Sequence, residues 1–338
     1  MTSDTFLAPP YLFATHPDAL PKALRHAQSL IGKWRQISDG FHLFETVIER
    51  PTAKRVIPSY SLASVQSLSY RFALQDSRGW HSLHPIGNAE PITHSDMAPH
   101  LGIGDKAITS DPQADFFDAL EAPAKLALFI HSDKEQDVLK KGLIALSYET
   151  PPMQTTNIEK PSQNLSLPPI SQYETDPENG HRICLAISTT MVMQPYGCAV
   201  TPDRIRDALY DPVLAAQGFE FPYGIWPNAV RTANRYGLNG LVTTIKNWES
   251  IAALLNNNIP VIASVAYEKG ELADAAIAQT RGHLMVLSGL NKERVFVHDP
   301  AGKTTDQVRR SYNRKEFEKA WWQNRDGAAI VLYPLNTI

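Results

Sequence analysis

The chain has 338 residues, of which 43% are hydrophobic and 20% charged, so it is long enough for two globular domains and is neither disordered nor fibrous in composition. Thirty-two Lys and Arg against 35 Asp and Glu give a net charge of -3, without a basic stripe interleaved with aromatics, so we do not expect nucleic acid as a partner. No apolar run approaches the roughly 20 residues of a membrane-spanning helix, and the N-terminus has no secretory-signal pattern. We therefore expect a cytoplasmic protein without membrane contact.

The first 150 residues have the pattern of a mainly β accessory domain. Apolar residues recur at helical spacing from Leu20 to Ile31, which predicts a helix over 17–34. Short segments rich in β-branched and aromatic residues follow it, separated by turn residues. These segments predict an antiparallel β-sandwich with strands over 41–49, 68–74, 125–130 and 143–149.

Residues 151–169 are rich in proline and small polar residues and are expected to be a linker. After the linker the order of expected elements changes, with helical segments first and strands later. This order is typical of an α+β domain, here over 170–338. Thr201, Pro202 and Asp203 form a good helix start, with Thr as N-cap and Pro at the first position. Helices are also expected over 184–193, 226–236 and 248–255, and strands over 260–267, 283–290 and 295–299.

Cys184 is the first candidate for chemistry. It opens an apolar stretch of about three helical turns that ends before Pro195, so its sulfur should lie at the N-terminus of a buried helix. The free backbone N–H groups and the helix dipole favour a thiolate there. Taken alone, Cys184 would more often be an inert core thiol, and a disulfide with Cys198 is left open by the sequence.

His283 and Asp299 are the candidate base and its orienting acid. His283 begins a nearly continuous apolar strand, and the chain returns after a short turn into a strand that ends at Asp299. If Leu290 pairs with Arg294, Met285 faces Asp299 and His283 is the diagonal neighbour of the acid, about 7 to 8 Å away at the backbone. A carboxylate at that distance can fix the tautomer of the ring, although a one-residue slip would turn Asp299 to the other face.

These residues stand in longer stretches that carry a family resemblance. The stretches are 169–173, which includes Gln172; Cys184 followed by Ser188, Thr189 and Met191; 263–272 followed by 282–286; 295–301; and 308–312 continued by Phe317 and Trp321. In this order, and over about residues 168 to 334, they resemble the bacteriocin-processing-type peptidases, cysteine-peptidase family thirty-nine, in its stand-alone bacterial branch.

The resemblance implies a papain-like fold and a cysteine peptidase that cleaves peptide bonds through an acyl-enzyme intermediate. It implies Cys184 as nucleophile, His283 as general base and then acid, and Asp299 as the residue that orients His283. Gln172 would lie on a strand ahead of the nucleophile and donate to the oxyanion. The implied partner is a peptide or protein substrate.

The sequence departs from the family at Leu185-Ala186-Ile187, where the family usually has Gly-Pro or Ser-Pro-Thr after the cysteine. Leu185 is therefore expected to place bulk beside the substrate. This departure keeps two alternatives open, a papain-like acyltransferase or amide hydrolase, and a catalytically degenerate peptide-binding protein. The N-terminal region would position substrate or bind a partner. The sequence has no zinc-ligand spacing or phosphate-binding loop, so we expect neither metal nor cofactor.

Overall fold

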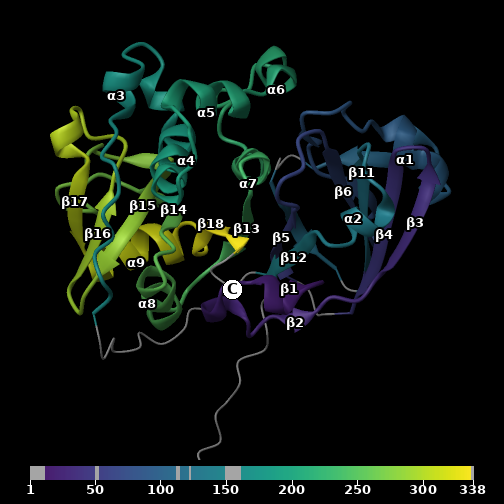
Figure 1. Ribbon diagram of the computed structural model, residues 1–338, viewed down its shortest axis with the longest axis horizontal. Coiled ribbons are helices and arrows are strands. Elements are labelled where there is room, and N and C mark those ends of the chain that lie inside the picture. Colours follow the sequence, from purple (N-terminus) through teal and green to yellow (C-terminus); the bar gives the residue numbers. More distant parts are fainter. Residues whose placement is uncertain (1–11, 50–52, 112–114, 122, 149–160, 336–338) are drawn as a thin grey trace, which may run out of the picture.

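The computed structural model describes residues 12–49, 53–111, 115–121, 123–148 and 161–335 (Figure 1). Three sheets form its frame, with five, seven and six strands. The first two sheets belong to the N-terminal part of the chain and the third to the C-terminal part. The fold is mixed α+β, as the sequence predicts.

The five-stranded sheet has the order β10-β5-β12-β1-β2, and the seven-stranded sheet has the order β3-β4-β11-β6-β7-β9, with β8 paired to β6. Most neighbours are antiparallel, except for the pairs β1–β2 and β7–β9. One apolar core contains residues from both sheets, including Tyr60, Tyr70 and Leu128. The strands are β1 (Leu12–Ala14), β2 (Gln28–Ser29), β3 (Lys33–Ser38), β4 (Phe41–Ile48), β5 (Ala53–Ser61), β6 (Ser69–Asp76), β7 (Gly79–Ser82), β8 (Ile86–Gly87), β9 (Ile108–Ser110), β10 (Phe117–Leu120), β11 (Ala124–His131) and β12 (Leu143–Tyr148).

The four strands predicted in this region are present as β4, β6, β11 and β12, although Glu149 lies outside the described residues. The helix predicted over 17–34 is wrong. Two short 3-10 helices, η1 (Pro17–Ala19) and η2 (Lys22–Leu24), stand there, followed by β2 and the start of β3. Pro21 cannot donate the helical hydrogen bond and its ring clashes with the preceding turn, so the two turns stay separate while still burying Leu20 and Leu24.

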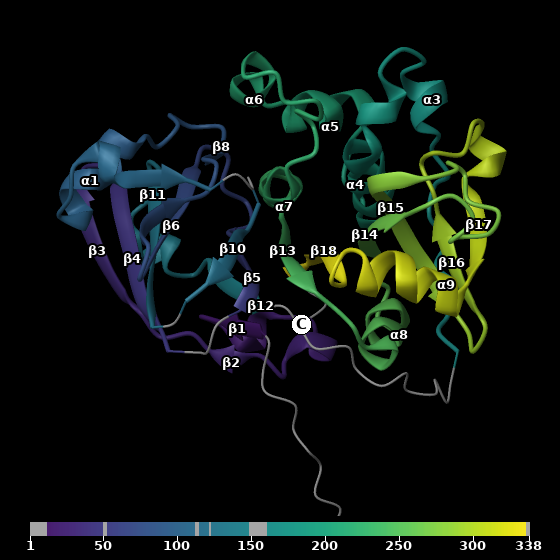
Figure 2. The same cartoon turned by 180° about the vertical axis from the view of Figure 1, so that it is seen from behind.

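The six-stranded sheet of the C-terminal part is antiparallel in the order β13-β18-β14-β15-β16-β17. One apolar core on its first face includes residues of α4, α5 and α7, and a second core on the other face includes residues of α8 and α9. Figure 2 shows α9 in front of the sheet and α4 behind it. The strands are β13 (Leu238–Thr244), β14 (Val261–Tyr267), β15 (Thr280–Leu290), β16 (Arg294–His298), β17 (Arg309–Asn313) and β18 (Ala328–Pro334).

Every helix predicted in this part is found within a residue or two of its expected bounds. The strand expected around Gln172 is wrong, because a helical turn begins at that residue. Ser171 caps this turn, accepting hydrogen bonds from the N–H groups of Tyr173 and Glu174. The elements are α3 (Gln172–Thr175), η4 (Gly180–Arg182), α4 (Cys184–Met193), α5 (Pro202–Leu209), α6 (Pro212–Ala216), α7 (Trp226–Arg235), α8 (Trp248–Asn256), α9 (Arg314–Glu318) and η7 (Lys319–Gln323); α1 (His94–Leu101) and α2 (Gln136–Leu139) lie in the N-terminal part.

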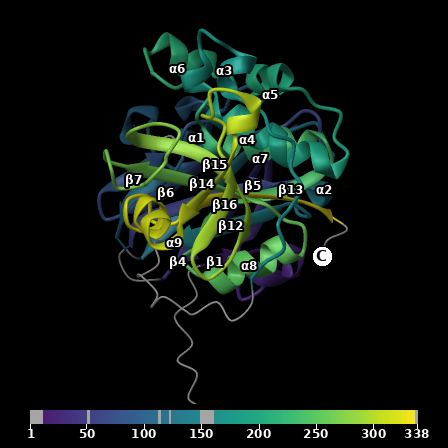
Figure 3. The same ribbon diagram turned by 90° about the vertical axis from the view of Figure 1, so that its left-hand side faces the viewer.

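The two parts of the chain are joined by buried contacts along β13. Ser59 Oγ accepts a hydrogen bond from Val242 N at 2.9 Å, and Ser147 Oγ donates to Thr243 Oγ1 at 2.7 Å. The core that contains α8 also takes in Leu12, Leu143 and other N-terminal residues. In Figure 3 the N-terminal strands lie behind the six-stranded sheet. The boundary between two domains stays a prediction, and the contacts show that the two parts share apolar core.

The described end of the expected linker, residues 161–169, packs against β15. Leu165 N donates to Ser288 O at 2.7 Å, and Leu167 is buried. Gly289 allows this approach, since a Cβ atom there would lie 2.9 Å from Asn164 Oδ1. These residues are therefore part of the C-terminal fold. Among the described helices, none has the length and apolar character needed to span a bilayer.

Candidate active site

Cys184 is the first residue of α4, as the apolar run predicts. Its own N–H therefore has no acceptor within the helix. Cys184 is partly exposed, and both cysteines are free, so the disulfide left open by the sequence does not form. Leu185 is fully buried in the core between α4 and the six-stranded sheet. The expectation that Leu185 places bulk beside the substrate is wrong, because its side chain fills the core instead.

His283 meets Asp299 across the β15–β16 hairpin. His283 Nε2 lies 2.8 Å from Asp299 Oδ1, and both side chains are almost wholly buried. The pairing predicted at the turn is off by one, because Leu290 pairs with Val295. A bulge between Leu287 and Gly289 then restores the predicted register, in which Leu287 pairs with Val297.

Asp299 is held by three hydrogen bonds to its carboxylate. Besides His283, Tyr312 Oη donates to Oδ2 at 2.9 Å, and Ala301 N donates to Oδ1 at 2.9 Å. Burial alone would raise the pKa of Asp299, but the charge of His283 and these hydrogen bonds outweigh burial and lower it. The acid is therefore ionised and fixed in orientation.

The imidazole of His283 also contacts the thiol of Cys184. Burial would lower the pKa of His283, but the charge and hydrogen bond of Asp299, followed by the hydrogen bond and charge of Cys184, raise this pKa to about 10. Because Nε2 of His283 contacts Asp299, Nδ1 is the ring nitrogen that remains for the contact with Cys184. The arrangement places an imidazolium between a carboxylate and a thiol, which is the geometry that activates a sulfur nucleophile.

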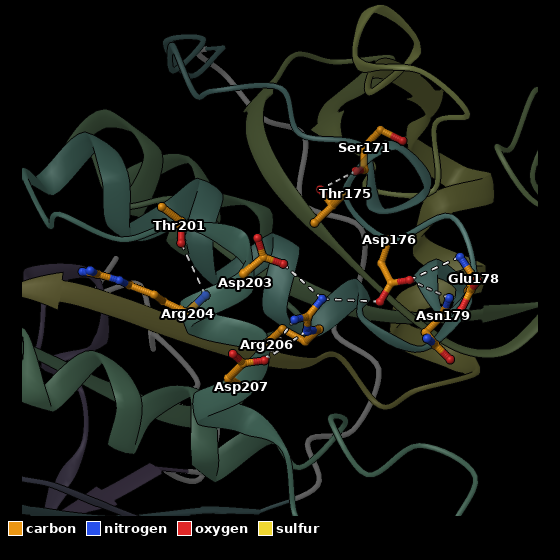
Figure 4. Close-up of polar contacts among 10 residues, drawn as sticks. All are labelled: Ser171, Thr175, Asp176, Glu178, Asn179, Thr201, Asp203, Arg204, Arg206 and Asp207. Carbon is orange, nitrogen blue, oxygen red and sulfur yellow. Dashed lines mark hydrogen bonds and ion pairs between the residues drawn. The ribbon is translucent and has the colours of Figure 1, made fainter.

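The N-terminal end of α4 is anchored on two sides. Ser188 Oγ, one turn below Cys184, donates to Leu284 O at 3.3 Å and so ties the helix to the strand of His283. The loop ahead of Cys184 is held by Asp176, which accepts hydrogen bonds from the N–H groups of Glu178 and Asn179 (Figure 4). Asp176 also pairs with Arg206 of α5 at 3.4 Å. These contacts hold α4 against β15 and tie the loop ahead of Cys184 to α5.

Gln172 lies close to the acid segment but makes no hydrogen bond to Cys184, His283 or Asp299. Its backbone N–H donates to Pro300 O at 2.9 Å, one residue after Asp299. Its side chain is 2% exposed, and its Oε1 has no hydrogen-bond partner among the described residues. This oxygen is an acceptor, so it can receive a hydrogen bond from a bound molecule.

Tyr312 and Ser188 are site residues to which the sequence assigned no role. Tyr312 lies opposite Val295 in the β16–β17 pair, and Val295 shares its face of the strand with Asp299. The alternation of side chains between the two faces of β16 and β17 could therefore have placed Tyr312 on the same face as Asp299. Among the described residues, no cluster of His, Cys, Asp and Glu could hold a metal ion.

The site thus brings a free thiol, a buried imidazole and a buried carboxylate together. Residues 164–329 match the model of the peptidase C39-like family, which supports the cysteine-peptidase family thirty-nine broadly and a peptidase as the class of protein. A solved structure described as a putative C39-like peptidase from Bacillus anthracis is 19% identical, with a TM-score of 0.38 over 52% of this chain and 98% of the other. No curated protein matches the chain.

Proposed function

We propose that the protein is a cysteine peptidase whose catalytic residues are Cys184, His283 and Asp299. The observation that carries this proposal is the position of the His283 ring, which contacts the thiol on one side and lies 2.8 Å from a buried carboxylate on the other. A structural histidine would need only one such partner. The family match over residues 164–329 adds independent support.

In the proposed reaction, the Cys184 thiolate attacks the carbonyl carbon of the scissile peptide bond. Negative charge develops on the carbonyl oxygen, where the Cys184 N–H and the Gln172 amide N–H₂ donate hydrogen bonds. The carbon–nitrogen bond then breaks, and His283 gives its proton to the leaving amine. Water attacks the acyl thioester and His283 accepts a proton from it; the carbon–sulfur bond breaks, the acid product leaves and the Cys184 thiolate is regenerated.

Transfer of the acyl group to an amine instead of water, or cleavage of another amide, uses the same residues and remains the second candidate. The degenerate peptide-binding alternative rested on Leu185, whose side chain is buried in the core. We therefore place catalysis ahead of binding alone. We further propose membership of the bacteriocin-processing type in its stand-alone branch, and a β-sandwich domain over 1–150 that helps to position substrate.

The test compares hydrolysis of a fluorogenic peptide library by wild type, Cys184→Ala and Cys198→Ala. Cys198 is the matched control, since it is a second free thiol that burial makes less acidic by raising its pKa. We expect cleavage by wild type and Cys198→Ala, and none by Cys184→Ala. Equal activity of wild type and Cys184→Ala would overturn the proposal, and adding an amine acceptor separates transfer from hydrolysis by the product mass.

A further inference from the structure

We propose that Arg325 binds a carboxylate of the substrate beside His283, so that the peptidase selects peptides with a negative charge near the scissile bond. This inference rests on the proposed function and names the class of substrate. It is carried by the place of Arg325, by the way its guanidinium is held, and by the absence of a carboxylate partner among the described residues.

Arg325 borders the exposed strip of backbone next to the proposed base. Gly282, the residue before His283, is exposed, and a Cβ atom placed on it would lie 3.9 Å from Arg325 Nη2. Apart from the guanidinium and the chain neighbours of Gly282, no described atom lies within 4 Å of that position. A substrate that passes over Gly282 therefore meets this guanidinium.

The guanidinium is held in one orientation by its neighbours. Arg325 Nε donates to Ser264 Oγ at 3.1 Å, and its Cζ lies 5.4 Å from the ring centroid of Trp226. The preceding residue, Asn324, donates from Nδ2 to Ala266 O at 2.8 Å and fixes the backbone against β14. With Nε occupied, the two Nη groups remain for a ligand. A pair of Nη groups matches the two oxygens of a carboxylate.

Among the described residues, no carboxylate forms an ion pair with Arg325, although the charges of Asp115 and Asp326 act on it and, against the larger effect of burial, work to raise its pKa. Asp326 pairs with Arg55 at 2.9 Å and lies 3.7 Å from Lys246, so its charge is already shared by two cations. Asp115 accepts a hydrogen bond from Trp226 N at 3.1 Å, and burial raises its pKa to about 7. The charge of Arg325 opposes this rise, so Asp115 is a partly ionised neighbour of Arg325 near neutral pH.

Burial, and after it the charge of Arg55, lower the pKa of Arg325. A half-buried cation that is partly desolvated and unpaired gains when an anion binds to it. The N-terminal part of the chain contributes to this setting, since Arg55 Cζ lies 4.2 Å from the ring centroid of Phe116. The N-terminal part therefore contributes a second positive charge near Arg325.

The reach of Arg325 limits where the charge can lie. Its Nη2 is at most about 9 Å from the Cα atom of His283, because neighbouring Cα atoms are about 3.8 Å apart. An extended peptide advances about 3.3 Å per residue. With about 3 Å more for the hydrogen bond, the bound carboxylate lies within about four residues of the scissile bond, which is beside His283 in the proposed reaction. It belongs either to an Asp or Glu side chain or to the C-terminus of the peptide.

The experiment measures kcat/KM for matched peptides with Glu or Gln at each position near the cleaved bond, and with a free or amidated C-terminus. We expect wild type to prefer the charged member of at least one pair by about 10- to 100-fold. Arg325→Ala should abolish that preference, Arg325→Lys should keep part of it, and Arg325→Glu should favour a Lys peptide. Arg35→Ala on β3, at the far edge of the seven-stranded sheet, is the control and should keep the preference.

The ratio between paired peptides does not depend on how much of a variant folds. A ratio that stays high in Arg325→Ala, or a wild type without preference while Cys184 is required for cleavage, overturns the role of Arg325 and leaves the peptidase intact. If wild type cleaves no peptide, the proposed peptidase function is contradicted, and this result says nothing about the role of Arg325. Binding of the same peptides to Cys184→Ala, and to the double variant with Arg325→Ala, then decides the carboxylate site by fluorescence polarisation.

Discussion

Replacing Tyr312 by Phe removes one hydrogen bond from the buried acid and leaves the rest of the site in place. Tyr312 is 1% exposed and donates to Asp299 Oδ2 at 2.9 Å. The change keeps the ring and its stacking on Phe317. Among the described residues, no other group then donates to Asp299 Oδ2, because His283 and Ala301 both bond to Oδ1.

A hydrogen bond to a charged group contributes about 1.5 to 3 kcal/mol, and a buried unpaired oxygen is penalised as well. We therefore expect Tyr312→Phe to lower the free energy of unfolding by about 2 kcal/mol. The pKa of Asp299 should rise, because one of the bonds that lowers it is lost. A less stable carboxylate supports the imidazolium of His283 less well, so kcat should fall by about tenfold, the factor that corresponds to roughly 1.4 kcal/mol.

Urea unfolding and kcat on a cleaved peptide measure the two effects separately. Tyr333→Phe is the matched control, since Tyr333 is equally buried and its Oη donates to the backbone oxygen of Ala19 at 2.9 Å. It should cost about 1 kcal/mol of stability without lowering kcat. If both variants change kcat equally, or Tyr312→Phe leaves kcat unchanged, the role assigned to Tyr312 is refuted.

Asp299→Asn should lower the pKa of His283 from about 10, as seen by NMR titration. In wild type the raised pKa stabilises the fold fully below pH 6.5, and this stability is lost as the pH rises towards 10, so the variant should show a flatter decline in that range. Gln172→Ala should lower kcat by about 10²- to 10³-fold with little change in KM, whereas an unchanged kcat would exclude an oxyanion role. Leu185→Ala should cost about 2 to 5 kcal/mol in urea unfolding and should not raise activity; a faster enzyme would restore the idea that Leu185 crowds the substrate.

The elements that carry the site could be predicted from local pattern. The apolar run after Cys184 and the following Pro195 are enough to place the start and end of α4, and the strand of His283 is equally apolar. By contrast, the helix expected over 17–34 is wrong, although Leu20 and Leu24 of its apolar set are buried; Ile31 of the same set is 83% exposed. Leu20 and Leu24 can be buried either by one continuous helix or by two separate turns. Pro21 favours the separate turns, because it cannot donate a helical hydrogen bond.

Contacts that depend on tertiary structure could not be predicted in the same way. The bulge between Leu287 and Gly289 shifts the pairing of the hairpin by one residue. The alternation of apolar residues along the strand does not predict this bulge. The burial of Leu185 depends on the orientation of α4 against the sheet. Arg325 comes from a segment about forty residues after His283 in the chain and reaches Gly282 only because that segment packs across β14.

The central claim is that His283 activates the sulfur of Cys184, and the rate of alkylation tests it most directly. Wild type and His283→Ala are treated with iodoacetamide near neutral pH, and the labelling of Cys184 and Cys198 is followed by peptide mass spectrometry. The account predicts that Cys184 reacts at least about tenfold faster than Cys198 in wild type and loses this advantage in His283→Ala. Equal rates for the two thiols in wild type, or a Cys184 rate that does not depend on His283, would contradict the account.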